Sequence, residues 1–116
     1  MNKKYIISKN EEIKKIIKLG TKKVSKYYII YSQNNEVDYN RYAISVSKKL
    51  GNAVLRNSLK RKTKEILRLN SINSNKNYVI ILRKDILELD YQNQTKELTN
   101  IIKGEEKWKK SYQYYV

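Results

Sequence analysis

The segment that most constrains the fold is residues 53–69, whose pattern predicts one long helix with two chemically opposite sides. Its apolar residues fall in one narrow sector of a helical wheel, at about 100° per residue: Leu55, Leu59, Ile66 and Leu69, with Thr63 at the edge. Its basic and amide residues gather on the other side: Arg56, Asn57, Lys60, Arg61, Lys64 and Arg68. Such a helix packs its apolar side on another layer and leaves the cations in solvent. Lys62 falls inside the apolar sector, so we expect its ammonium to extend past the packed stem.

Three segments rich in β-branched and aromatic residues supply the other layer, a small sheet. They are residues 27–32, 42–47 and 78–82. The second segment alternates, which puts residues 42, 44 and 46 on a core face and leaves the small and polar residues between them on the other face. The third is continuously apolar, as expected for an interior strand that is covered on both sides.

Two shorter helices complete the pattern, at about residues 10–19 and 91–103. Ser8 and Glu11 have the spacing of a capping box at the start of the first helix, and Gly20 can end it. The sequence therefore predicts an α+β fold, an α-β sandwich with helices packed on a small central sheet, in the order α-β-β-α-β-α.

Length and charge indicate one small domain with a polyanionic partner. The 116 residues suit a single domain, which we place at residues 1–104, followed by a loosely ordered tail at residues 105–116. The 26 basic and 11 acidic residues give a formal net charge of +15, which favours nucleic acid first and an anionic membrane surface second. Abundant Lys, Ile, Asn and Tyr suggest an A/T-biased genome, so lysine is a weak indicator. Three of the five scarce arginines, however, lie between residues 56 and 68.

The surroundings of those arginines favour nucleic-acid binding over an ordinary solvated basic face. Glu65 is the only acid in the long helix, so acidic i,i+4 partners for the cations are nearly missing. Lys48 and Lys49 extend the basic surface through the preceding loop. Gly51 and Asn52 then form a turn into the helix N-terminus, where free backbone N–H groups and the helix dipole favour an anion.

The composition excludes several kinds of chemistry. The chain contains neither Cys nor His, which removes disulfides, the usual zinc sites, and serine-triad or papain-like catalysis. The acids at residues 85–90 do not form an evident two-metal carboxylate cluster. The only apolar run near the start is residues 5–7, so we read no signal peptide or membrane span and expect a cytoplasmic protein.

Residues 45–68 read SVSKKLGNAVLRNSLKRKTKEILR and closely resemble a segment of the protein subunit of bacterial ribonuclease P, the enzyme that removes 5′ leaders from precursor tRNAs. The family carries two lysines, then Gly-Asn-Ala-Val, then Arg-Asn-x-x-Lys-Arg on a helix. The matching residues here are Lys48-Lys49, Gly51-Asn52-Ala53-Val54, Arg56-Asn57 and Lys60-Arg61. Residues 9–21, 27–31 and 78–84 are similar to the family's first helix and two of its strands, so the likeness covers about residues 9–102.

The chain departs from the family pattern at several positions. Ser58 stands where the family usually completes an Arg-Asn-Arg run, and Lys64 stands where an arginine is common. Ile13 and Ile17 replace two phenylalanines of the first helix. The resemblance also implies a fourth strand and a left-handed β-α-β crossover in a ribosomal-protein-like domain, whereas general rules alone predict a right-handed crossover.

The resemblance implies an accessory subunit whose RNA partner is the catalyst, with no catalytic residues in the protein. Mg²⁺, held mainly by RNA and substrate, would activate the attacking water. The implied partners are the ribonuclease P RNA and precursor tRNA, with the protein as a monomer in the ribonucleoprotein and no membrane contact. The residues implied to bind RNA are Lys48, Lys49, Asn52, Arg56, Asn57, Lys60, Arg61, Lys64 and Arg68. The residues implied to line a cleft for the 5′ leader, between the first helix and the sheet, are Ile13, Ile17, Tyr28, Tyr31 and Ser45.

Three other hypotheses are compatible with the residues alone. They are another RNA-binding protein such as a ribosomal protein, a protein-only nuclease, and a basic protein of membrane surfaces. At the cleft, Ile13 and Ile17 fit simple core packing as well as they fit a binding groove.

Overall fold

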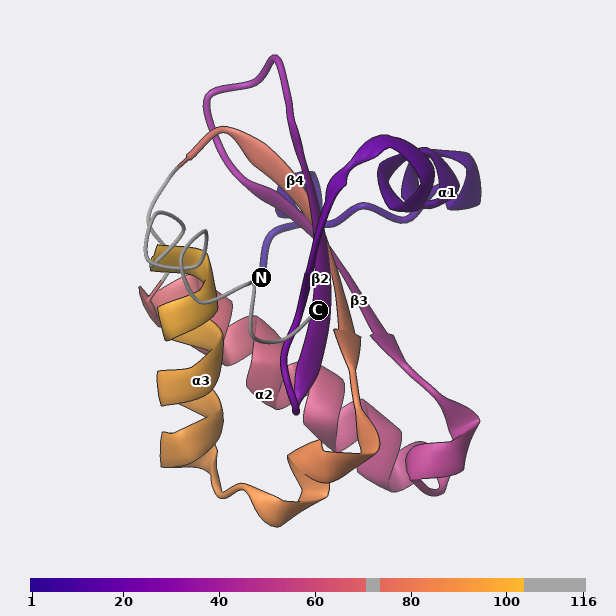
Figure 1. Cartoon of the computed structure of the whole chain (residues 1–116), viewed down its shortest axis with the longest axis vertical. Helices are drawn as coiled ribbons and strands as arrows, with labels where there is room; N and C mark the ends of the chain where they lie inside the picture. The colour runs from indigo at the N-terminus through magenta and orange to yellow at the C-terminus, as the bar shows by residue number, and fades with distance from the viewer. Residues whose placement is uncertain (71–73, 104–116) are drawn as a thin grey trace.

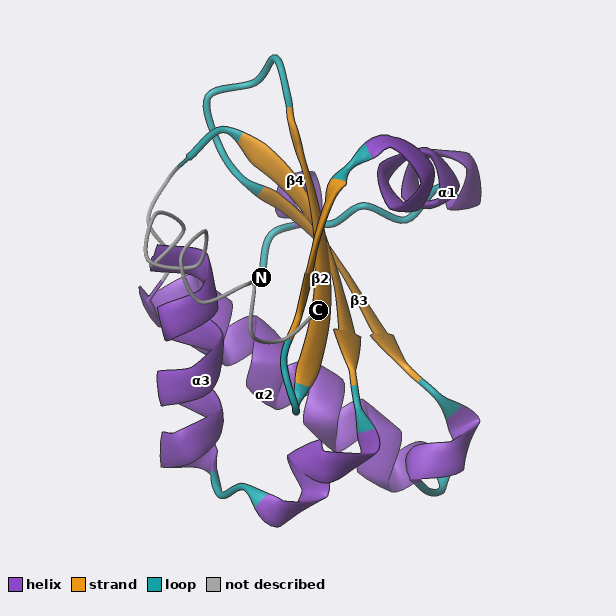
Figure 2. Cartoon of the chain, in the orientation of Figure 1, coloured by secondary structure: helices purple, strands orange, loops and turns teal. Residues whose placement is uncertain are grey.

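The computed structural model describes residues 1–70 and 74–103, so the predicted tail at residues 105–116 lies outside the described part. The helices and strands are α1 (Asn10–Leu19), β1 (Thr21–Val24), β2 (Tyr28–Asn34), β3 (Arg41–Val46), α2 (Ala53–Asn70), β4 (Lys76–Leu82) and α3 (Tyr91–Lys103). Short 3-10 helices lie at η1 (Lys3–Tyr5), η2 (Lys48–Leu50) and η3 (Lys84–Glu88). The α+β prediction is confirmed, with the helices packed on a small sheet (Figures 1 and 2).

The sheet runs in the order β1-β2-β4-β3. Strands β1 and β2 pair antiparallel, as do β2 and β4, whereas β3 and β4 pair parallel with α2 as the connection between them. Strand β4 is therefore an interior strand, as its continuous apolar run predicted. The hand of the β3-α2-β4 crossover stays a prediction of the family resemblance.

Strand β1 is the element that the residue pattern missed, although the family resemblance implied a fourth strand. Its sequence is Thr-Lys-Lys-Val, and its first two residues are exposed. A short, polar edge strand of this kind forms because β2 supplies backbone partners, here Thr21 opposite Ser32 and Val24 opposite Ile29. Intrinsic strand propensity carries little signal at such a position.

One face of the sheet carries the main hydrophobic core, covered by α2 and α3. The buried sheet residues on this face alternate along the strands, and they are Tyr28, Ile30, Tyr42, Val46, Tyr78, Ile80 and Leu82. The helices contribute Leu59, Ile66, Leu67, Leu98 and Ile101. The predicted core face of β3 is confirmed, since Tyr42 and Val46 are buried and Ile44 packs against the cluster.

Helix α2 packs by a face that is rotated from the predicted one. Its buried residues are Leu59, Thr63, Ile66 and Leu67. Leu55 and Leu69, which the helical wheel placed in the core, are 37% and 59% exposed. Thr63 can lie in the buried face of α2 because its hydroxyl donates a hydrogen bond to the Leu59 carbonyl oxygen at 2.8 Å. The same rotation leaves Lys62 in solvent, as predicted.

The opposite face of the sheet carries a smaller core beneath α1. The buried members are Ile7, Ile16, Ala43 and Val79, with Ile13, Tyr31 and Ile81 partly buried around them. Figure 1 shows α1 on the other side of the sheet from α3. Ala43 was predicted to lie on a small, polar face; it is buried because Ile7 and α1 lie over that end of β3.

Helix α1 is held on the sheet by contacts other than the predicted capping box. The residue at its N-cap is Lys9, which makes no side-chain capping bond, so the Ser8–Glu11 prediction is wrong. Instead, Glu12 accepts a hydrogen bond and forms an ion pair with Arg41 of β3 at 2.9 Å. At the other end, a side chain on Gly20 would place its Cβ 2.7 Å from the Ser32 carbonyl oxygen of β2, so only glycine permits this close approach.

Candidate RNA interface

The start of α2 is fixed by a turn that only a glycine adopts without strain. Gly51 has a φ of 153°, and a Cβ there would lie 2.6 Å from Cδ2 of Leu55. Asn52 then caps the helix, because its Oδ1 accepts from the backbone N–H of Leu55 at 2.9 Å. Asn52 is exposed, so its side-chain amide can still meet a ligand while the oxygen holds the cap.

The cations predicted to bind RNA gather on and before α2. Lys48 and Lys49 are exposed on η2, which is anchored by the buried Leu50. On α2, Arg61 and the Asn57 amide are exposed, and the half-buried cations are Arg56, Lys60 and Lys64. Within residues 1–70 and 74–103, no carboxylate pairs with any of these lysines or arginines. We call this surface, from Lys48 to Lys64, the α2 basic face.

Two arginines of the helix differ from the rest. The Nε of Arg56 is enclosed and has no hydrogen-bond partner among the described residues, so this donor is unsatisfied within the described part of the protein. Arg68 instead donates to Glu65, with Nη2 2.7 Å from Oε1, and the bond to this carboxylate raises the pKa of Arg68. Arg68 is therefore partly neutralised, whereas the cations before it are not.

On the α1 side, the sheet presents two rows of side chains, which follow from the strand register. The first row contains Tyr31, Val79 and Ala43, directly opposite one another on β2, β4 and β3. Val79 and Ala43 are buried beneath the N-terminal segment and α1. Tyr31, at the β1 side of the row, stays partly exposed, and the Lys22 ammonium of β1 lies 5.8 Å from its ring centroid.

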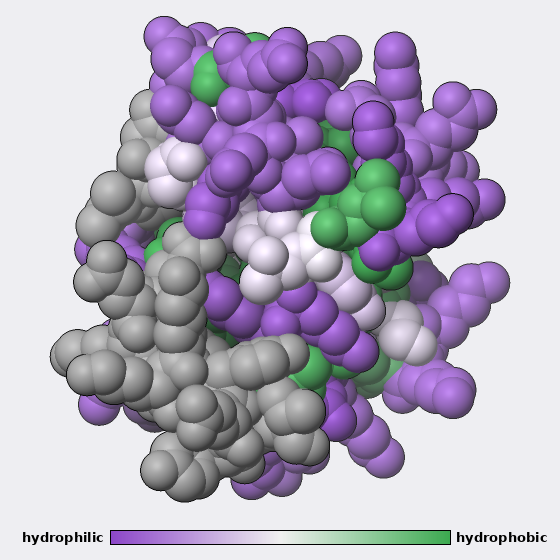
Figure 3. Space-filling view, turned by 45° about the horizontal axis from the view of Figure 1, so that its top comes forward, coloured by the Kyte–Doolittle hydropathy of each residue, from purple (hydrophilic) through white to green (hydrophobic). Residues whose placement is uncertain are grey.

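The second row, one pleat further along, contains Val24, Ile29, Ile81 and Ser45. Val24, Ile29 and Ile81 are only partly buried and Ser45 is exposed, so the helix does not cover this row completely. Ile17 of α1 is 38% exposed. Figure 3 shows hydrophobic atoms reaching an otherwise mostly hydrophilic surface on the right of the view, the side on which Figure 1 places α1.

The predicted leader residues divide between these places. Ile13 is partly buried against the smaller core, Ile17 is exposed, and Ile16 between them carries the packing. Tyr31 and Ser45 lie on the open rows. The structure thus brings four of the five predicted residues to the α1 side. On α1 itself, Ile16 makes the packing contact, whereas Ile17 supplies exposed apolar surface.

The structure corrects the predicted position of Tyr28 in the leader cleft. Its side chain is 0% exposed and lies in the main core on the opposite face of the sheet. There its hydroxyl lies 3.5 Å from the Gln94 carbonyl oxygen of α3, and burial raises the pKa of the phenol. Because side chains alternate along a strand, residues 28 and 31 cannot share a face. The same parity rule places Ile29, and not Tyr28, on the face of β2 that carries Tyr31.

Within residues 1–70 and 74–103, no three His, Cys, Asp or Glu side chains come together in a way that could hold a metal ion. In the same part of the chain, no helix has the length and apolar character needed to cross a membrane.

Comparisons with known proteins agree on one family. The family model described as Ribonuclease P matches residues 1–105. The ribonuclease P protein component of Mycoplasma mycoides is 41% identical over 106 residues, covering 89% of this chain and 97% of the relative. That of an Exiguobacterium species is 38% identical over 111 residues, covering 95% and 97%.

Solved structures give the same result. A Staphylococcus aureus RNase P protein, a mutant with defective mRNA degradation activity, superposes with a TM-score of 0.81 at 33% identity, over 90% of each chain. The RNase P protein from Thermotoga maritima superposes with a TM-score of 0.78 at 30% identity, over 84% of this chain and 94% of that one.

Proposed function

This chain belongs to the bacterial ribonuclease P protein family, and from that premise we propose how it takes part in tRNA processing. Membership implies association with the ribonuclease P RNA in an endoribonuclease complex. In our proposal the α2 basic face binds this RNA, while the open rows beside α1 receive the single-stranded 5′ leader of precursor tRNA. Family membership also removes the ribosomal-protein alternative.

The observation that carries the RNA half of the proposal is the lack of internal partners for the α2 basic face. Among the described residues, Arg56, Lys60 and Arg61 have no carboxylate within ion-pair distance. Cations without internal partners are free to neutralise phosphates, and binding would release the counterions condensed on the RNA. Arginine adds a planar fork that can contact two phosphate oxygens.

The leader half of the proposal rests on the chemistry of the open rows. Tyr31 offers an aromatic face on which a base can stack, and Lys22 brings an ammonium beside it for a phosphate. Ile29, Ile81 and Ile17 add partly exposed apolar surface. Aromatic and apolar surfaces beside cations bind single strands with little sequence selectivity, which suits leaders of varied sequence.

We further propose that catalysis depends on Mg²⁺ held mainly by the RNA and the substrate. The chain has no His or Cys to act as a general base or metal ligand near neutral pH. Within the described residues its carboxylates do not gather into a metal site. The protein would thus position substrate and RNA, and the metal ions would activate the attacking water.

Reconstitution tests this function. The full chain is added to its cognate ribonuclease P RNA at limiting Mg²⁺, and cleavage of a 5′-labelled precursor tRNA is measured. We expect the protein to restore leader removal that the RNA alone performs poorly under these conditions. Unchanged cleavage rate and unchanged substrate affinity would refute the proposal.

Two controls accompany the reconstitution. The protein without RNA should leave the precursor intact, and cleavage by RNA-free protein would support a protein-only nuclease instead. Lys96→Gln, which removes an exposed cation of α3 outside the α2 basic face, should behave like the unaltered chain.

A further inference from the structure

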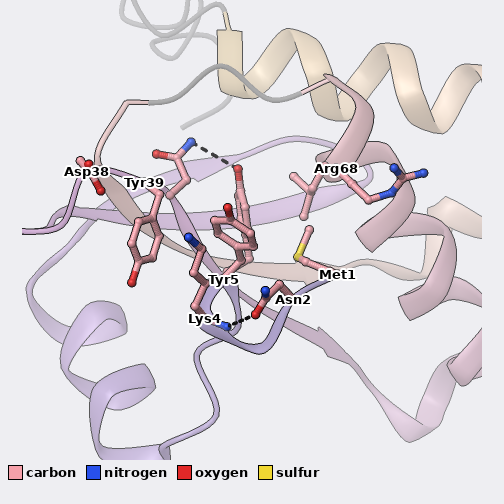
Figure 4. Close-up of a pocket in the computed structure, with 10 residues that line it drawn as sticks. Met1, Asn2, Lys4, Tyr5, Asp38, Tyr39 and Arg68 are labelled. Carbon is pink, nitrogen blue, oxygen red and sulfur yellow. Dashed lines mark hydrogen bonds between the residues drawn. The ribbon is translucent and has the colours of Figure 1, made fainter.

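A cavity of about 670 Å³ lies away from both surfaces of the proposed function. Its residues come from three segments that are far apart in the sequence: the N-terminal residues through η1, the loop before β3 with the start of β3, and the last turns of α2. In Figure 4, Tyr5, Lys4 and Tyr39 stand on one side, with Met1 and Arg68 on the other. This volume falls within the usual range of small-molecule sites.

The first wall is aromatic and cationic. The rings of Tyr5 and Tyr39 meet edge to face, with centroids 5.3 Å apart and planes at 88°. Both rings are partly exposed. The ammonium of Lys4 lies 5.0 Å from the centroid of Tyr5 and 4.9 Å from that of Tyr39. Two aromatic surfaces thus share one positive charge, which is the combination that recognises a base and its phosphate.

The loop that contains Tyr39 is held in place by hydrogen bonds of the buried side-chain amide of Asn40. Asn40 is 5% exposed, and its Oδ1 accepts from the backbone N–H groups of Ser74 and Lys76 at 3.0 and 3.1 Å. Its Nδ2 donates to the Tyr42 hydroxyl at 3.2 Å. The tyrosine wall is therefore positioned before any ligand arrives, which lowers the entropic cost of binding.

The second wall carries a cation from α2. Leu67 is buried at this wall, and the Arg68 side chain reaches its rim. Both hydrogen bonds from Arg68 to Glu65 use Nε and Nη2, so within the described residues Nη1 has no partner. Lys4 and Arg68 can therefore contact a phosphate from the two sides of the cavity.

We propose that this cavity binds one unpaired nucleotide of an RNA, with its base against the Tyr5 and Tyr39 rings and its phosphate between Lys4 and Arg68. The base takes the place that the Lys4 ammonium holds in the free protein. The exchange is favourable because stacking on an aromatic ring is stronger than an exposed cation–π contact. RNA is the source that the position favours, since Arg68 lies at the end of the helix that carries the α2 basic face.

Nucleotide binding is tested on the full chain with adenosine 5′-monophosphate as the probe, by following backbone amide chemical shifts. We expect shifts at residues 2, 4, 39 and 68, and weaker effects from adenosine or ribose 5-phosphate alone. Tyr39→Leu should raise the Kd of the probe roughly 5- to 150-fold, which corresponds to the loss of one base–aromatic stack. Tyr91→Leu is the matched control, because Tyr91 is exposed on α3 outside the cavity.

A second variant covers the possibility that Tyr39→Leu disturbs the loop. Lys4→Gln leaves both rings in place, so it should weaken binding of adenosine 5′-monophosphate but not of adenosine. Shifts confined to α1 and β2, or no shifts at all, would overturn the proposal, and so would equal losses for Tyr39→Leu and Tyr91→Leu.

A separate experiment tests whether the bound nucleotide belongs to an RNA, and only this experiment rests on the proposed function. Tyr39→Leu should raise the Kd for the cognate ribonuclease P RNA or for precursor tRNA, whereas Tyr91→Leu should not. If Tyr39→Leu loses the mononucleotide but binds both RNAs unchanged, the cavity takes a free nucleotide and the RNA assignment is wrong. If instead the α2 basic face does not bind RNA, loss of Arg61 should leave the affinity for RNA unchanged. The mononucleotide result would not be affected.

Discussion

The two faces of the sheet are covered to different degrees. Beneath α2 and α3, aromatic and aliphatic side chains from three strands are almost completely enclosed. Beneath α1, the core cluster contains four buried residues among those that the structure describes, and the next row of side chains stays partly open. Helix α1 has ten residues and α2 has eighteen, so the shorter helix can cover less of the sheet. The contrast indicates that the face beneath α2 and α3 contributes most of the stability, and under the proposed function the more open face receives the leader.

The largest expected difference between the faces is in stability. Leu98→Ala removes a side chain that is 0% exposed in the main core, so the free energy of unfolding should fall by about 2–5 kcal/mol. Ile17→Ala on α1 should cost less than about 1 kcal/mol, because that side chain is already 38% exposed. Urea unfolding of both variants measures the difference. Similar losses would mean that α1 is as firmly packed as α3.

The converse difference should appear in leader recognition. Tyr31→Ala should weaken binding of precursor tRNA to the reconstituted complex by about 1–3 kcal/mol, which is the value of one base–aromatic stack. Mature tRNA, which lacks the leader, should bind as before. Equilibrium binding of the two tRNAs gives the comparison, with Tyr91→Ala as the control. Equal losses for both tRNAs would remove Tyr31 from the leader site.

The smallest expected effect concerns the ion pair that ties α1 to β3. The hydrogen bond and charge of Arg41 hold the pKa of Glu12 below its usual value of 4.5. A lowered folded-state pKa stabilises the protein above about pH 4.5, and this contribution is lost as the pH falls through the folded-state pKa. Glu12 is 37% exposed, so solvent screening limits the contribution to about 0.2–1 kcal/mol.

Glu12→Gln measures this ion-pair contribution. The variant should be less stable than the unaltered chain at about pH 6, and the gap should narrow as the pH falls below about 4.5 and through the folded-state pKa of Glu12, down to about pH 3. A gap that is the same at both pH values would show that the carboxylate charge of Glu12 does not stabilise α1 on the sheet.

The sequence predicted the fold well where one pattern decided it. The bounds of α1 and α3 and the core parity of β3 follow from local periodicity, and the structure agrees. Strand β1 could not be found in this way, because its pairing with β2 and not its composition makes it a strand. The face of α2 was misjudged for a related reason: Thr63 and Leu67 are buried because α2 lies against both the sheet and α3, which a helical wheel does not contain.

The candidate sites were predictable to a similar extent. The cations of the α2 basic face could be identified from a local motif, and no carboxylate pairs with them among the described residues, whereas Arg68 pairs with Glu65. Their binding to RNA stays a prediction. The cleft residues depended on the resemblance, and Tyr28 was misplaced although strand alternation excludes it. The cavity at Tyr5 and Tyr39 joins three distant segments, so no local pattern could reveal it.

The central claim is that α2 turns its apolar side to the sheet and offers its cations to RNA. The most direct test is the salt dependence of binding to the cognate ribonuclease P RNA, measured for the unaltered chain, Arg61→Gln and Lys96→Gln. Arg61→Gln should weaken binding and flatten the plot of log affinity against log salt by roughly 0.7–0.9, the value of one phosphate contact, while Lys96→Gln leaves it unchanged. The same slope for all three proteins would contradict the claim.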